Sequence, residues 1–217
     1  MVAVSIFIGG VRPLPVSGRP TGMYKSRVNS PIQIGPEGLR GDRQADRRVH
    51  GGPEKALHLY PARHYAMLAA MFPAAASLLA PGAIGENLST DALDEGDVRI
   101  GDVWQLGSAK IQACQPRSPC WKIDERFACD GMAQFIAASG LTGWYWRVLQ
   151  PGTVAPGEPL ERIASEPEAP TLREAMQLWR EHRPPVAALE RLASVQGLAG
   201  AWREKIVQRI DWLRRSP

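Results

Sequence analysis

Short apolar or alternating segments, each bounded by Gly, Pro, Asn or Asp, dominate residues 1–163. Such segments are typical of β-strands joined by turns. The segments 97–100, 102–106 and 109–114 are separated only by Gly-Asp and Gly-Ser, which favours an antiparallel meander of three strands. The pattern predicts strands over residues 2–8, 28–34, 97–100, 102–106 and 109–114.

Two helices are expected within this strand-rich part. Residues 61–72 place Tyr65 and Leu68 on one face, and Pro61 suits the first position of a helix. A shorter helix is predicted over residues 132–139. Because Gly (21 residues) and Pro (19 residues) imply many loops, the body is predicted to be mainly β.

The spacing of apolar positions becomes helical after the Pro- and Glu-rich segment 164–170. Thr171 and Glu174 have the spacing of a capping box, which predicts the start of one helix. A pair of prolines at 184–185 predicts the start of a second helix. The last helix is expected to bury one stripe of side chains, formed by Trp202, Ile206, Ile210 and Leu213.

The charge of the chain changes at the same place. Residues 171–217 hold nine Lys or Arg against five Asp or Glu, and so carry the whole net charge of +4. Charge and periodicity together predict a β domain over residues 1–165 and a three-helix bundle over residues 166–217. The tail arginines alternate with acids, so a continuous basic face for nucleic acid is not expected.

The cysteines indicate a reducing compartment. Cys114, Cys120 and Cys129 are odd in number and form no CxxC pair, which argues against a disulfide framework and against structural zinc. No apolar run reaches the roughly 18 residues expected of a membrane-spanning helix. The first ten residues lack the basic start of a secretory signal. A cytoplasmic protein is predicted.

The stretch GLRGDRQADRRVHGGPEKALHLYP (38–61) could bind an anion. The consecutive glycines Gly51 and Gly52 let backbone N–H groups converge, and Lys55 adds a positive charge beside them. His50 and His58 bracket this turn. The spacing fits neither a Walker loop nor a dinucleotide fingerprint. A tight turn with solvated basic residues explains the stretch equally well.

The stretch GENLST (85–90) gathers polar side chains. Asn87 and Ser89 could hydrogen-bond a ligand, and Glu86 could act as an acid, a base or an orienting group. A helix cap or an Asx-turn accounts for the same residues at least as well.

The stretch QPRSPCWKID (115–124) contains a cysteine in a stiff and basic setting. Pro119 precedes Cys120, while Arg117 and Lys122 would favour its thiolate form, which both nucleophiles and soft-metal ligands need. An inert buried cysteine is the alternative. A nucleophilic pairing of Cys120 with His50 or His58 also stays open, since sequence does not show that they meet.

These three stretches, in this order, resemble the MOSC domain, the module named after the C-terminal part of molybdenum cofactor sulfurases. The resemblance is strongest to stand-alone bacterial proteins of the YiiM type. HGGP, GENL and SPC carry it, and it covers most of residues 38–123. It implies a closed, strongly bent β-barrel with inserted helices, followed by a three-helix unit.

The resemblance also implies a cofactor, Mo-molybdopterin, which is a pterin dithiolene that carries a phosphate. In the family the cysteine of the SPC-like motif gives its thiolate to molybdenum, and that position is Cys120 here. His50 and Asn87 are the other catalytic candidates. The candidate cofactor-binding residues are Gly51, Gly52, Lys55, His58, Tyr60, Asn87, Arg117, Ser118 and Lys122.

The implied activity is reduction of N-hydroxylated compounds, such as hydroxylaminopurines. No flavin, haem or iron–sulfur motif is visible, so a separate flavin or iron–sulfur reductase would supply the electrons. Sulfur transfer through a Cys120 persulfide is the alternative, although a chain without a pyridoxal-phosphate domain does not resemble a complete sulfurase. The tail could dock the reductase or form a homodimer contact.

Overall fold

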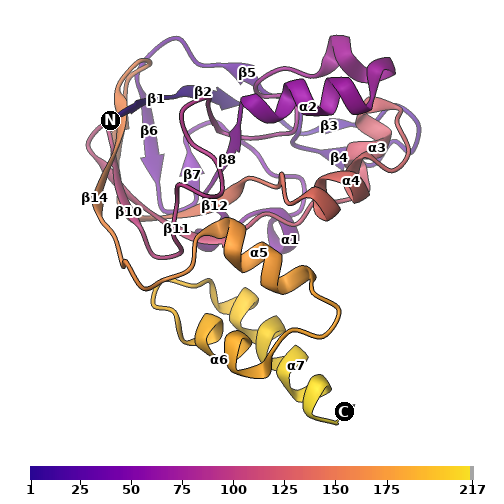
Figure 1. Ribbon diagram of the computed structural model, residues 1–217. Coiled ribbons are helices and arrows are strands. Elements are labelled where there is room, and N and C mark those ends of the chain that lie inside the picture. The colour runs from indigo at the N-terminus through magenta and orange to yellow at the C-terminus, as the bar shows by residue number, and fades with distance from the viewer. Residues whose placement is uncertain (216–217) are drawn as a thin grey trace.

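The computed structural model describes residues 1–215 (Figure 1). About 33% of the chain is helical and 26% is strand. Helix and sheet therefore contribute comparably, and the prediction of a mainly β protein is too narrow. No helix among the described residues is both long enough and apolar enough to cross a bilayer.

A nine-stranded sheet forms the body of the molecule. In order across the sheet, its strands are β1 (Val2–Ala3), β14 (Pro159–Ala164), β10 (Val103–Leu106), β11 (Ala109–Pro116), β12 (Trp144–Gln150), β8 (Leu57–Pro61), β9 (Leu88–Thr90), β2 (Ser5–Ile8) and β5 (Ser26–Arg27). Neighbours are antiparallel except β8 and β9, which are parallel. A three-stranded sheet contains β13 (Gly152–Val154), β6 (Ile32–Gly35) and β7 (Gly38–Leu39). A small hairpin contains β3 (Arg12–Pro13) and β4 (Pro20–Thr21).

The predicted closed barrel is not found. Among residues 1–215, no pairing joins the two ends of the nine-stranded sheet, β1 and β5. The strand predicted over residues 2–8 is interrupted at Val4, with β1 paired to β14 and β2 paired to β9. Both end strands are only two residues long, so each offers few backbone groups for a closing ladder.

Local predictions had mixed outcomes. The hairpin of β10 and β11 and the helix α4 (Met132–Ser139) are confirmed. The strand predicted over residues 97–100 is wrong, since this segment forms turns and contributes one isolated bridge. Pro61 ends the buried strand β8, and the helix α2 (Arg63–Met71) begins only after it.

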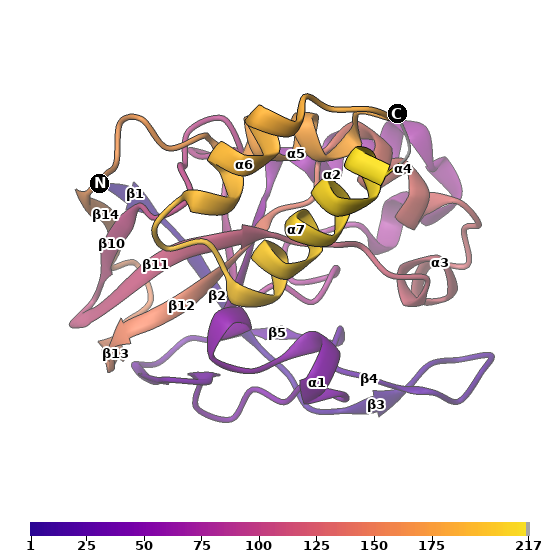
Figure 2. The same ribbon diagram turned by 90° about the horizontal axis from the view of Figure 1, so that it is seen from below.

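The predicted tail helices are present as α5 (Leu172–Arg180), α6 (Val186–Ser194) and α7 (Gly200–Arg215). Thr171 and Glu174 form the reciprocal capping box, and the predicted stripe on α7 is buried. Figures 1 and 2 show the three helices side by side beneath the sheet. Their apolar side chains join the hydrophobic cluster of the sheet, whereas the division into domains at residue 165 stays a prediction.

The remaining helical segments of the described chain are short. They are α1 (Arg47–His50), the 3-10 helices η1 (Pro53–Lys55) and η2 (Pro73–Leu78), and α3 (Lys122–Phe127). A second apolar cluster lies beneath α2, α3 and α4, and it includes Leu68, Phe127 and Ile136. This cluster supports the segment that carries Cys120.

Candidate functional site

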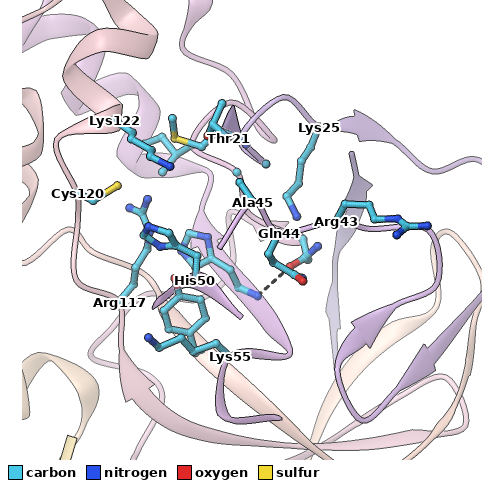
Figure 3. A pocket seen from close by; sticks show the side chains of 17 residues that line it. Thr21, Lys25, Arg43, Gln44, Ala45, His50, Lys55, Arg117, Cys120 and Lys122 are labelled. Carbon is cyan, nitrogen blue, oxygen red and sulfur yellow. Dashed lines mark hydrogen bonds between the residues drawn. The ribbon is translucent and has the colours of Figure 1, made fainter. Parts of the chain in front are cut away.

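A cleft with about 610 Å³ of empty space, part of it open to solvent, lies where α1, η1, β8 and the loop between β11 and α3 meet (Figure 3). Segments 21–25, 43–45 and 84–87 complete its wall. Seven residues predicted from the sequence are brought together here: His50, Lys55, His58, Asn87, Arg117, Cys120 and Lys122. Segments far apart in the chain therefore build one site.

The charged side chains of the cleft all have the same sign. Among the described residues that line it there are five cations and no carboxylate. Figure 3 shows Arg117 and Lys122 on the side of the Cys120 thiol, with Lys25 across from them. A cleft that concentrates positive charge in this way favours an anionic ligand.

Arg117 has an unusual environment for a cation. It is 6% exposed, and its Nη1 atom is buried without a hydrogen-bond partner among residues 1–215. Its backbone N–H donates to the carbonyl of Gly143 at 3.0 Å, which fixes the exit from β11. A buried cation without a paired anion costs free energy. A bound anion would offset this cost.

Cys120 lies between the end of β11 and the start of α3. Its side chain is half-buried, and its carbonyl accepts a hydrogen bond from the backbone of Ile123 at 3.0 Å. The ammonium of Lys122 donates to the carbonyl of Pro20 at 2.7 Å, which ties α3 to the β3–β4 hairpin. Hydrogen bonds of Lys122 and Ile123, which follow Cys120 in the chain, thus hold the thiol at the cleft.

The two histidines of the cleft are held neutral at physiological pH. Burial, together with Arg117, Lys122 and Lys55, lowers the pKa of His50 to about 4. Burial and the charge of Arg117 also place the pKa of His58 well below its usual value. The Nε2 atom of His58 has no partner within the described structure. Both rings can therefore meet a ligand as uncharged donors or acceptors.

Acid is expected to destabilise the protein through His50. The unfolded ring takes up a proton below about pH 6.5, whereas the folded ring stays neutral down to about pH 4. Stability is thus lost as pH falls through this window, by about 1 to 2 kcal/mol after allowance for solvent screening. Urea unfolding across the window should show a smaller loss for His50→Gln than for the wild type. His58 has a shift of the same sign, so some slope remains. Parallel losses in both proteins would contradict the assignment.

Polar groups of the GENLST stretch bind the protein itself. Asn87 accepts from the backbone of His58 at 3.2 Å and donates to Asp42 at 2.9 Å. Glu86 accepts from Tyr65 at 2.6 Å, while Ser89 donates to a backbone carbonyl. Burial raises the pKa of Glu86. Asn87, the site candidate of this stretch, lines the cleft. The oxygen and the nitrogen of its side-chain amide already form hydrogen bonds within the protein.

Four predicted site residues do not line the cleft: Gly51, Gly52, Tyr60 and Ser118. Tyr60 is fully buried in the second apolar cluster, and its hydroxyl has no hydrogen-bond partner in the described part of the chain. Gly52 has φ of +91°, so its role in the turn suits glycine whether or not a ligand binds. Contact of these four with a cofactor stays a prediction.

Sequence reasoning missed Lys25. It lines the cleft and is paired with Asp42 at 2.6 Å, with both side chains almost completely buried. Burial lowers the pKa of Lys25, although Asp42 opposes the shift. No motif spacing links Lys25 to Cys120 in the sequence, so only the fold reveals the proximity. The other lining residues not singled out are Thr21, Gly22, Met23, Arg43, Gln44, Ala45, Ile84, Gly85 and Tyr145.

Cys114 is expected to be the least reactive thiol. It is fully buried, its sulfur contacts the carbonyl oxygen of Glu54 at 3.1 Å, and burial raises its pKa to about 12. Alkylation of the folded protein near pH 8 should therefore modify Cys114 at least about 100-fold more slowly than Cys120. Mass spectrometry of the peptides gives both rates, and urea-unfolded protein is the control. Equal rates in the folded protein would show that the burial of Cys114 is wrong.

Comparison with known proteins places the chain in a family. A sequence model of the MOSC domain matches residues 46–161. Protein YiiM of Escherichia coli (strain K12) is 37% identical over 207 residues, which cover 95% of this chain and 91% of that protein. The crystal structure of YiiM from Escherichia coli superposes with a TM-score of 0.82 at 32% identity, covering 97% of this chain and 92% of that one.

A further relative is named for an activity. A protein of Gibberella moniliformis named Reductase is 32% identical over 164 residues, which cover 75% of this chain but only 29% of that protein. The family model matches more than half of this chain, and the YiiM relatives span nearly all of it. The chain therefore belongs to the MOSC domain family and is a YiiM-type member of it.

Proposed function

We propose that this protein binds the molybdenum cofactor in the cleft and reduces N-hydroxylated compounds. The main support is Arg117, a buried guanidinium with one nitrogen that has no hydrogen-bond partner among the described residues. The cleft around it is lined by cations, and no carboxylate is among its described lining residues. The neighbour of Arg117 in the cleft is the Cys120 thiol (Figure 3). An anionic ligand that carries a thiolate-binding metal fits both the guanidinium and the thiol.

The residues present suit this cofactor group by group. A phosphate would pair with Arg117, Lys122 and Lys55 through charge-assisted hydrogen bonds. A thiolate is a soft ligand that suits a metal already held by dithiolene sulfurs, and Cys120 would supply it. His50 and His58, both neutral, could hydrogen-bond the pterin ring.

When bound, the cofactor would supply two-electron oxygen-atom transfer at molybdenum. The net reaction breaks the N–O bond of the substrate, consumes two electrons and two protons, and releases an amine and water. The protein would orient the substrate and exclude solvent from the cleft. A separate flavin or iron–sulfur reductase would deliver the electrons.

The proposal is tested by production in two hosts, one competent for molybdenum-cofactor synthesis and one deficient. We expect molybdenum and pterin in near-stoichiometric amounts from the competent host only. That protein should reduce a hydroxylaminopurine when a reduced viologen dye supplies electrons. Protein without molybdenum from the competent host would refute the proposal.

Sulfur transfer through Cys120 is the second candidate, because the half-buried thiol lies beside cations that would stabilise a persulfide anion. The two functions give different products. A carrier would be isolated with cyanide-releasable sulfur and would reduce nothing, whereas a reductase would turn over without it.

A further inference from the structure

Glu54 lies between the glycine turn and Lys55, on η1, at the edge of the cleft. Glu54 is not among the described residues that line the cleft, and its carboxylate contacts the first residue of α7. The backbone N–H of Gly200 donates to both carboxylate oxygens, at 3.1 and 2.9 Å. A carboxylate at a helix N-terminus also stabilises the helix dipole. A residue next to the cleft thus binds the start of the last tail helix.

Glu54 also contacts β11, the strand that leads to Arg117. Its backbone carbonyl accepts from the side chain of Gln115 at 3.0 Å, and Cys114 contacts it at 3.1 Å. The backbone N–H of Ala199, just before α7, donates to the carbonyl of Cys114 at 2.9 Å. Three segments, namely η1, β11 and the start of α7, are therefore joined around one glutamate.

A fourth contact joins Glu54 to β12. Nη2 of Arg147 lies 2.8 Å from Oε1 of Glu54, and both side chains are only partly exposed. Partial burial strengthens such a pair relative to one on the open surface. Loss of the Glu54 charge would weaken two contacts together, those with Arg147 and with Gly200.

Like charges on the tail and in the cleft make the energy of this junction depend on a bound ligand. Lys205 is an exposed residue of α7, and after burial it is the largest cause that lowers the pKa of Lys55. Docked α7 therefore brings a second positive charge toward the cleft. Repulsion between these ammonium groups opposes docking, and an anion beside Lys55 would relieve it.

We propose that Glu54 is a positioning residue that couples the C-terminal helices to the cleft, so that an anion in the cleft and a docked α7 stabilise each other. The inference rests on the proposed anion-binding cleft. Coupling of this kind is reciprocal. The factor by which a bound anion raises the equilibrium constant for docking of α7 equals the factor by which docking raises the affinity for the anion. The tail helices are then part of the binding site without lining it.

The test uses inorganic phosphate and full-length protein from the cofactor-deficient host. Hydrogen exchange of backbone amides 199–203 reports docking of α7, and calorimetry gives the phosphate dissociation constant. In the wild type, phosphate should slow exchange of these amides. In Glu54→Gln, exchange should be faster without phosphate, and the dissociation constant should rise about fivefold.

Two further variants separate coupling from a merely structural role. Glu190→Gln removes an exposed carboxylate that pairs with Arg214 on the same tail, and should change neither measurement. Without phosphate, amides 199–203 of Lys205→Gln should exchange no faster than those of the wild type. Phosphate should slow their exchange less than it does in the wild type. A residue that only stabilised the fold would not produce this second result.

Three outcomes would overturn the inference. One is equal phosphate affinity, within about twofold, in Glu54→Gln and the wild type. Another is phosphate binding that leaves exchange of amides 199–203 unchanged. In both cases, cofactor binding by protein from the competent host would leave the proposed function standing. If the wild type binds neither phosphate nor cofactor, the proposed function fails as well.

Discussion

Cys120→Ser is expected to lose molybdenum and to reduce turnover of N-hydroxylated substrates by more than about 100-fold. Changes to residues that only support a metal ligand cost about 10- to 100-fold, so loss of the ligand itself should cost more. Serine has nearly the same shape, but its hydroxyl is a hard donor that stays protonated at neutral pH. Metal analysis and dye-driven reduction measure the two losses.

The fold of Cys120→Ser should be unchanged. The thiol is half-buried and makes no hydrogen bond within the described structure, so the free energy of unfolding should shift by no more than about 0.5 kcal/mol. Cys129→Ser is the matched control, since Cys129 is also half-buried but does not line the cleft. Full metal content and activity in Cys120→Ser would remove Cys120 from the site.

Arg117→Met is expected to abolish cofactor retention while making the cofactor-free protein more stable. Methionine fills a similar volume and removes a buried charge that pairs with no acid among the described residues. Replacement of buried ionic groups by apolar ones often stabilises proteins by about 1 to 4 kcal/mol. For a chain of this length, a gain of 1 kcal/mol raises Tm by about 2 to 4 °C.

The opposite signs of these effects make the test of Arg117 decisive. Thermal unfolding of protein from the cofactor-deficient host gives the stability, and pterin analysis from the competent host gives retention. Arg43→Met is the control: Arg43 also lines the cleft, but it is exposed and points away from Cys120 in Figure 3, so no gain in Tm is expected. A drop in Tm for Arg117→Met would show that the guanidinium stabilises the fold itself.

Local patterns predicted the elements whose stability is local. The capping box at Thr171 and Glu174 and the apolar stripe of α7 depend on residues within a few turns of one helix, and both are confirmed. The segment 97–100 alternates like a strand, yet it forms turns. Its neighbours explain this difference, because Arg99 pairs with the backbone at Thr171 and donates to the carbonyl of Ala169.

The sequence predicted only part of the sheet: β8, β9, β12 and β14 were not predicted as strands, whereas the β10–β11 hairpin was predicted together with its pairing. Apolar alternation identified β10 and β11, which pair through a short turn. The interruption at Val4, which sends β1 to β14 and β2 to β9, depends on partners more than 80 residues away. The expected closed ring was therefore wrong for a non-local reason.

The sequence by itself determined which residues could do chemistry: a cysteine among prolines and cations, a glycine turn with a lysine, and two histidines. Their types and order also matched the MOSC family. Only the tertiary structure decided which of them share a cleft, that Lys25 joins them, and that Asn87 and Glu86 bind the protein instead. The reason is physical: side-chain chemistry is carried by each residue, whereas burial and the pairing of charges depend on distances between segments that only the fold brings together.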